Sequence, residues 1–169
     1  MKHLLSKSGA ALIAILMIPA IANSQDVKQK SSAKESFTHD TLFVHNLVSK
    51  YTHSIDVADT ALGSAIWAHT AEVSFTNPRG NEYGWENIKK IYAFFQENFS
   101  SRKLTFNHLR FTNYGDVMWL EFFWTFDSKT KPDGKAIQTK GRETQIWKKV
   151  NTDWRLVHVH YSGMPVTKT

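Results

Sequence analysis

The chain has 169 residues, a formal charge of +6 and no cysteine. Without cysteine it has no disulfide and no lipid-modified cysteine, and its scattered basic residues give little support to nucleic-acid binding. The length fits one domain with a core of its own. Six Trp and eleven Phe indicate side chains that fill this core or line an apolar pocket.

The first 22 residues are arranged like a secretory signal. Lys2 and Lys7 precede an uncharged apolar run of 14 residues from Gly9 to Ala22, and Ala20-Ile21-Ala22 ends it. A membrane-spanning helix needs about 20 such residues. We therefore predict cleavage after Ala22, a periplasmic or secreted protein, and no membrane association afterwards. Loss of the two lysines lowers the formal charge from +6 to +4.

The N-terminal half of the exported chain is predicted to be mostly helical. Residues 23–36 are polar and without periodicity, which predicts a flexible tail. One helix follows, with Thr38 or Asp40 as its cap and an apolar stripe at spacings of four, three and four. That stripe consists of Val44, Val48, Tyr51 and Ile55. Residues 56–59 interrupt, and a short second helix runs to about Trp67.

A brief strand over 73–76 and a turn over 77–80 precede a third helix, which starts near Trp85. Its predicted buried face contains Ile88, Ile91, Tyr92, Phe95 and Phe99. Everything after Ser101 reads as strands. In the first of them the alternation changes phase between Phe106 and Leu109, which predicts a bulge.

Three more strands complete a predicted antiparallel meander. Residues 117–126 are apolar almost throughout, so we expect a central strand covered on both faces. Turns at 114–116, 131–134 and 151–153 separate it from strands over 137–150 and 154–161. We predict one domain over residues 37–165 and a short tail over 166–169.

The closing hairpin, ETQIWKKVNTDWRLVHVHYSG (143–163), is similar to the last strands of the calcium/calmodulin-dependent protein kinase II association domain. Over residues 38–165 the chain resembles the nuclear transport factor 2-like superfamily, including ketosteroid isomerases and SnoaL-like cyclases. The resemblance implies an α+β cone, in which three helices pack in a highly curved, mostly antiparallel sheet. It also implies a homodimer through the outer face of the sheet.

Strand alternation under this resemblance divides the last two strands into two faces. Glu143, Gln145 and Tyr161 are expected in the pocket, whereas the predicted dimer interface contains Glu121, Arg142, His158 and His160. The association domain has ligand-facing arginines at the positions of Gln145 and Tyr161. Both are neutral here, so the resemblance does not indicate a carboxylate ligand.

Two other kinds of site find little support. His158 and His160, with Glu121, have the residue types of a metal site, but histidines two apart on a strand are more often packed or interfacial, here with hydrogen bonds to Glu121 or Arg142. We therefore predict no metal and no cofactor. Nucleophilic catalysis lacks both a cysteine and a Gly-x-Ser-x-Gly motif.

Acid–base chemistry leaves two candidate catalytic residues, Glu143 and Tyr51. Ketosteroid isomerase-like proteins use a buried carboxylate base and a tyrosine of the first helix. Residues 72–80 lack the aspartate that those isomerases use as base. Tyr51 also fits a core position, and Glu143 also fits a structural pairing with a lysine, an arginine or a backbone group.

The sequence thus leaves two functions open. The first is binding of a small hydrophobic or amphipathic molecule without transforming it, and the alternative is proton transfer in the same pocket. The predicted ligand-binding residues are Tyr51, Trp67, Trp85, Phe122, Trp124, Glu143, Gln145 and Tyr161. For each tryptophan taken singly, a place in the core is the more common role.

Overall fold

The computed structural model describes residues 22–163, with side chains from residue 40 onward. The predicted signal segment up to Ile21 and the C-terminal tail lie outside the described residues. The chain divides into one unit up to His39 and a second from Asp40 on, and the second contains every described strand. Within residues 22–163, every helix is too short or too polar to cross a bilayer.

The first helix, α1 (Ala22–Val57), corrects two predictions. It begins neither at Thr38 nor at Asp40, and residues 23–36 are helical rather than a loose tail. Residues 23–39 contain neither Gly nor Pro and include Gln, Lys, Ala and Glu, which are good helix formers. Absence of an apolar stripe therefore did not mean absence of a helix. From residue 40 on, the predicted stripe is confirmed, because its four residues are all buried.

A short break separates α1 from α2 (Thr60–Ile66). Ala58 adopts a left-handed conformation, and the Asp59 carboxylate caps α2 by accepting hydrogen bonds from the N–H groups of Ala61 and Leu62. The predicted interruption is confirmed at residues 58–59, whereas residues 56 and 57 still belong to α1.

The other elements are β1 (Ser74–Asn77), β2 (Gly80–Tyr83), α3 (Trp85–Asn98), β3 (Phe99–Asn113), β4 (Val117–Thr130), β5 (Ala136–Val150) and β6 (Asp153–Gly163). The strands form one sheet in the order β2-β1-β6-β5-β4-β3. Only the β1–β6 pair among them is parallel. We expected a single short strand before α3, whereas two form a hairpin. The third helix ends at Asn98, so Phe99 belongs to β3.

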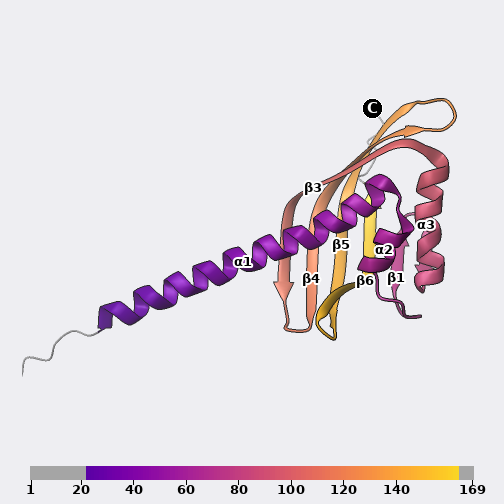
Figure 1. Cartoon of the computed structure of the whole chain (residues 1–169). Helices are drawn as coiled ribbons and strands as arrows, with labels where there is room; N and C mark the ends of the chain where they lie inside the picture. Colours follow the sequence, from indigo (N-terminus) through magenta and orange to yellow (C-terminus); the bar gives the residue numbers. More distant parts are fainter. Residues whose placement is uncertain (1–21, 164–169) are drawn as a thin grey trace, which may run out of the picture. The chain divides into compact units, whose positions relative to one another are not determined.

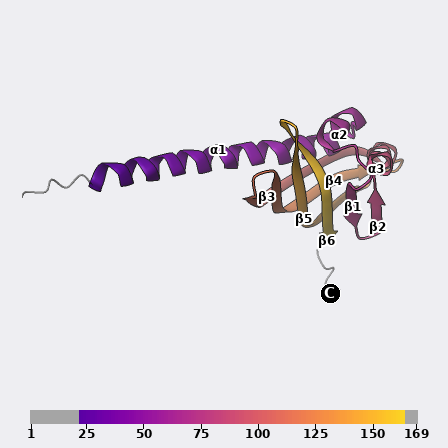
Figure 2. The same cartoon turned by 90° about the horizontal axis from the view of Figure 1, so that it is seen from below.

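The sheet curls, and the part of α1 from Asp40 on crosses one of its faces (Figures 1 and 2). Helices α2 and α3 pack on each other, and α3 contacts both β2 and β3 at opposite ends of the strand order. The core fills the space between these helices and the sheet. This is the predicted α+β cone of three helices in a curved, mostly antiparallel sheet.

Two features of β3 shape the concave side. Its register against β4 shifts between Asn107 and Arg110, and His108 takes a left-handed φ of 52°, which confirms the predicted bulge. The end of α1 is tied to β3 by Asp56, whose Oδ1 accepts a 2.5 Å hydrogen bond from the Leu104 N–H. Lys103 Nζ pairs with Asp56 Oδ2 at 2.7 Å.

Strand β4 lies inside the sheet, but it is not covered on both faces as predicted. Its concave face is buried, as at Leu120 and Phe122. On its outer face Trp119 and Phe123 are 37% and 38% exposed. The apolar character of this strand therefore has two origins, a core on one side and an open apolar surface on the other.

Candidate functional site

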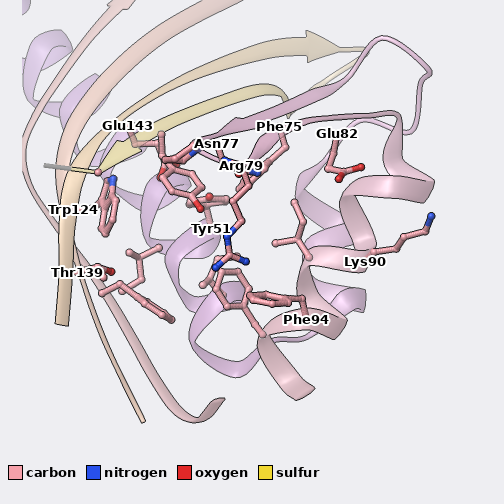
Figure 3. A pocket seen from close by; sticks show the side chains of 18 of the residues that line it. Tyr51, Phe75, Asn77, Arg79, Glu82, Lys90, Phe94, Trp124, Thr139 and Glu143 are labelled. Carbon is pink, nitrogen blue, oxygen red and sulfur yellow. Dashed lines mark hydrogen bonds between the residues drawn. The ribbon is translucent and has the colours of Figure 1, made fainter. Parts of the chain in front are cut away.

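A cavity of about 540 Å³ lies within the cone, bounded by α1, α3, the β1–β2 hairpin and the strands β3 to β6. Figure 3 shows side chains from these elements converging on it. Its wall is dominated by apolar and aromatic side chains: Ile55, Phe75, Ile91, Phe94, Phe95, Phe99, Leu104, Trp124, Phe126 and Tyr161. A cavity of this size and character is typical of sites for small organic ligands.

A buried carboxyl group forms the polar floor of this cavity. Glu143 is 4% exposed, and its Oε1 accepts a 2.7 Å hydrogen bond from Gln145 Nε2. Gln145 Oε1 in turn accepts a 2.8 Å bond from Trp147 Nε1. The Tyr51 side chain, which also lines the cavity, interacts with the same carboxyl group.

Burial decides the protonation of this floor. It raises the pKa of Glu143 to about 8, although the hydrogen bonds from Gln145 and Tyr51 act in the opposite direction. None of the ion pairs formed within residues 40–163 includes Glu143, which corrects the alternative of a pairing with lysine or arginine. Burial, and then the charge of Glu143, raises the pKa of Tyr51 well above its usual value. Near pH 7 both groups are mainly protonated and able to donate hydrogen bonds.

Trp124 and Tyr161 form an aromatic corner beside Glu143. Their rings meet edge to face with centroids 5.6 Å apart, and Trp124 Nε1 donates a 3.1 Å hydrogen bond to the Arg142 carbonyl. Gly141 leaves room for this indole, since a Cβ there would lie 2.5 Å from the ring and 1.9 Å from the Ser162 carbonyl oxygen. The corner therefore depends on a glycine in the adjacent strand.

The mouth of the cavity carries charge. Arg79, in the turn between β1 and β2, places its Cζ 5.5 Å from the centroid of the Phe94 ring. Glu82 of β2 and Lys90 of α3 lie on the same rim (Figure 3). The site thus combines an apolar wall, neutral hydrogen-bond donors at the floor and charged groups at the opening.

Four of the eight predicted ligand-binding residues line the cavity: Tyr51, Trp124, Glu143 and Tyr161. The other four, Trp67, Trp85, Phe122 and Gln145, are buried elsewhere and are corrected to core positions. Trp67 packs on Phe75, Trp85 stacks on His69, and Phe122 lies against Phe106. Gln145 has the expected inward direction, but it acts through Glu143.

Sequence reasoning missed the charged mouth. The segment Asn77-Pro78-Arg79-Gly80 was interpreted only as a turn, although a hairpin at the end of a cone places its tip beside the opening. Phe94, which lies outside the predicted buried stripe of α3, was missed as well. Its 39% exposure marks it as an aromatic side chain that does not belong to the core.

The outer face of the sheet contains the four residues predicted for the dimer interface. The register aligns Glu121 with Thr144 and Thr144 with His160, while His158 pairs with Ile146 and Arg142 with Ser162. The expected hydrogen bonds of the histidines to Glu121 or Arg142 are wrong. His158 Nδ1 lies 2.7 Å from Ser74 Oγ, and Glu121 pairs with Arg110 at 3.6 Å.

Burial, followed by the positive charge of the neighbouring His160, lowers the pKa of His158. The Arg142 guanidinium covers the ring of Phe123 at 5.2 Å. In the part of the chain that the structure describes, no three His, Asp or Glu side chains converge as metal ligands would.

Comparison with known proteins identifies the family. The SnoaL-like domain matches residues 44–167. The chain belongs to the SnoaL-like domain family. A solved protein of the nuclear transport factor 2-like superfamily from Salmonella enterica serovar Typhimurium is 36% identical, with a TM-score of 0.72, over 78% of this chain and 96% of that one. No curated protein matches the sequence.

More distant structures share the fold of this SnoaL-like protein. A cystatin-like protein of unknown function from Nostoc punctiforme is 16% identical, with a TM-score of 0.61 over 75% of this chain and 92% of that one. Hexachlorocyclohexane dehydrochlorinase LinA-type3 from Novosphingobium barchaimii is 12% identical, with a TM-score of 0.66 over 79% and 92%. At such identities the likeness concerns the fold alone.

Proposed function

We propose that this SnoaL-like protein binds a small amphipathic molecule in its cone without transforming it. The observation that carries the proposal is the cavity of about 540 Å³, whose aromatic wall ends at the buried carboxyl group of Glu143. An apolar wall with few polar groups favours a compact organic ligand. Glu143 and Tyr51 are hydrogen-bonded to each other, so the protonated pair retains one hydroxyl proton that can be donated to a carbonyl or hydroxyl group of that ligand.

Binding without reaction is favoured by the make-up of the floor. Near neutral pH Glu143 is mainly protonated, so only a small ionised fraction of it is present to act as a base. The cavity residues described here include no histidine and no aspartate to serve as a second acid–base group. A group that holds its proton is better suited to recognise a ligand than to abstract a proton from it.

We further propose that the protein works outside the cytoplasm, on the basis of the lysines and apolar run of residues 1–22. Cell fractionation of the source organism, with mass spectrometry of the N-terminal peptide, tests this directly. The expected mature N-terminus is Asn23. A protein that retains Met1 and remains in the cytoplasmic fraction would contradict export without affecting the binding proposal.

Native mass spectrometry tests for the ligand on protein purified from its own host. Thr139→Trp places a large ring at the rim of the cavity, while Lys140→Trp places it on the opposite face of β5. We expect a co-purified small molecule on the wild type and on Lys140→Trp, and a much smaller bound fraction on Thr139→Trp. Equal occupancy of the two variants, or ligand-free protein throughout, would contradict the proposal.

Proton transfer is the second candidate, because the pKa of Glu143 lies close to physiological pH and the group lines an apolar site. Deuterium exchange at the carbon next to the carbonyl of a cyclic ketone, followed by NMR, tests it. The binding proposal predicts exchange at the uncatalysed rate. Catalysed exchange that rises with pH and disappears in Glu143→Gln would establish an enzyme instead.

A further inference from the structure

The Arg79 side chain is exposed to solvent and also lines the mouth of the cavity. Its guanidinium lies over the ring of Phe94 on α3, and its positive charge also acts on the hydroxyl of Tyr161 on β6, opposing the effect of burial on the pKa of that group. Figure 3 shows the Arg79 side chain directed toward Phe94. The guanidinium interacts with residues on two sides of the opening. It is therefore positioned to contact a ligand that enters the cavity.

This guanidinium has no protein acceptor among residues 40–163. The ion pairs and side-chain hydrogen bonds of this region do not include it, and Arg79 is held instead through its backbone N–H, which donates a 2.8 Å bond to Asn77 Oδ1. A guanidinium presents a rigid fork of N–H donors that matches a carboxylate in two parallel hydrogen bonds. Stacking on Phe94 leaves the edge of this fork free for such a partner.

The charges at the mouth leave one positive charge without a counterpart. Glu82 and Lys90 on the rim are opposite in sign, and Lys90 Nζ is engaged by Asn87 Oδ1 at 2.9 Å. Of the two cations, Arg79 is the one whose charged group makes no hydrogen bond or ion pair with another residue of 40–163. A single carboxylate balances it, whereas a doubly charged phosphate would leave negative charge beside the apolar wall.

Building on the proposed function, we propose that the ligand is a hydrophobic carboxylic acid whose carboxylate pairs with Arg79 at the mouth. Its apolar body lies along the aromatic wall, and its far end reaches the donors at Glu143 and Tyr51. The neutral residues Gln145 and Tyr161 argued against an anionic ligand from sequence. The structure supplies the cation from another element, the β1–β2 turn.

A pair of probes that differ only in charge tests this assignment. 2-Naphthoate and 2-naphthamide have the same ring system, and quenching of tryptophan fluorescence or calorimetry at pH 7 reports their binding. Wild type is compared with Arg79→Gln and with Lys148→Gln, which removes an exposed charge outside the cavity. Solvent screens the charge of the partly exposed Arg79 and so limits its contribution to the affinity for the acid. We therefore expect 2-naphthoate to bind about tenfold more tightly than 2-naphthamide.

Arg79→Gln is expected to abolish this preference while the affinity for 2-naphthamide stays unchanged. Lys148→Gln is expected to retain it. Equal binding of the two probes to wild type, or a preference that persists in Arg79→Gln, would overturn the carboxylate assignment and leave the proposed function standing. Failure of both probes to bind wild type would overturn both.

Discussion

Gln145 is held between two partners that fix the direction of its amide group. Trp147 Nε1 can only donate, so it donates a 2.8 Å hydrogen bond to the side-chain carbonyl oxygen of Gln145. The side-chain nitrogen of Gln145 must then donate to Glu143 Oε1, at 2.7 Å. Oε1 is therefore an acceptor in both protonation states of the carboxyl group. The proton of Glu143 is left to Oε2, which makes the floor of the cavity a directed hydrogen-bond donor.

The stability of the protein should fall as pH rises because of Glu143. Its pKa is about 8 in the folded protein against an ordinary value of 4.5. Between these values the unfolded chain has released the proton that the folded chain retains, so this group destabilises the fold by up to about 1.4 kcal/mol per pH unit. Below pH 4.5 and above pH 8 its contribution no longer changes.

Urea unfolding of wild type and Glu143→Gln at pH 5, 6, 7 and 8 measures this effect. The variant cannot ionise, and its side-chain oxygen still accepts from Gln145. The difference in unfolding free energy should shift in favour of the variant by a few kcal/mol from pH 5 to 8. Parallel curves for the two proteins would show that Glu143 is ionised, or freely solvated, at neutral pH.

Asp56 should stabilise the cone through a backbone group rather than through its ion pair. Its side chain is 11% exposed and accepts from the Leu104 N–H, while its partner Lys103 is 65% exposed. Asp56→Ala leaves that N–H without its acceptor, at a cost of about 1–3 kcal/mol. Lys103→Ala should cost less than about 0.5 kcal/mol. Chemical denaturation of both variants checks the order, and equal losses would show that the ion pair dominates.

Gly141 and Gly163 face each other across β5 and β6, which makes them a matched pair for a packing test. A Cβ at Gly141 meets the Ser162 carbonyl oxygen and the Trp124 ring, whereas one at Gly163 meets nothing within 4 Å. We expect Gly141→Ala to lower the unfolding free energy by about 1–3 kcal/mol and to shift the fluorescence of Trp124. Gly163→Ala should stay within about 0.5 kcal/mol of wild type. Similar losses of unfolding free energy in both variants would show that Gly141 is not needed to make room for the Trp124 indole.

Most of the fold could be predicted from periodicity, because the elements from residue 40 on have apolar faces that pack in the core. The stripe of α1 and the bulge in β3 follow from the positions of apolar side chains. The inward direction of Glu143 and Tyr161 follows from strand alternation once the register of the resembled association domain is assumed. The helix over residues 23–36 could not, since it has no apolar face and rests on intrinsic propensity. Strand β2 could not be predicted from periodicity either, because all four of its residues are exposed and it has no apolar face.

The site was only half predictable. Alternation predicts which face of a strand a residue is on. It does not predict at which position along the strand the cavity ends and the packed core begins. Phe122 and Gln145 therefore have the predicted direction and still lie in the core. Arg79 reaches the site because a hairpin folds back over α3, a tertiary relationship that a turn motif does not encode.

The outer face of the sheet should bind a second copy of the chain. Trp119 and Phe123 are large, apolar and more than one-third exposed on a strand inside the sheet, and exposed apolar patches commonly mark interfaces. Phe123→Glu places a charge on this surface without entering the core. Light scattering at micromolar concentration should show a dimer for wild type and a monomer for the variant, with unchanged circular dichroism. A monomeric wild type would contradict the proposal.

Acidification through about pH 6 should weaken this dimer through His158. Burial and the charge of His160 lower the pKa of His158. A partner subunit would bury the imidazole further and lower its pKa again. The dimer then favours the neutral ring, so its stability is present above the pKa of His158 in the free subunit, which lies below the ordinary histidine value of about 6.5, and is lost as pH falls through that lower range. Dimer dissociation constants at pH 7.5 and 5.5 should differ less in His158→Gln and His160→Gln than in wild type. If these variants dimerise normally at both pH values but lose ligand binding, the two faces of the sheet have the opposite roles.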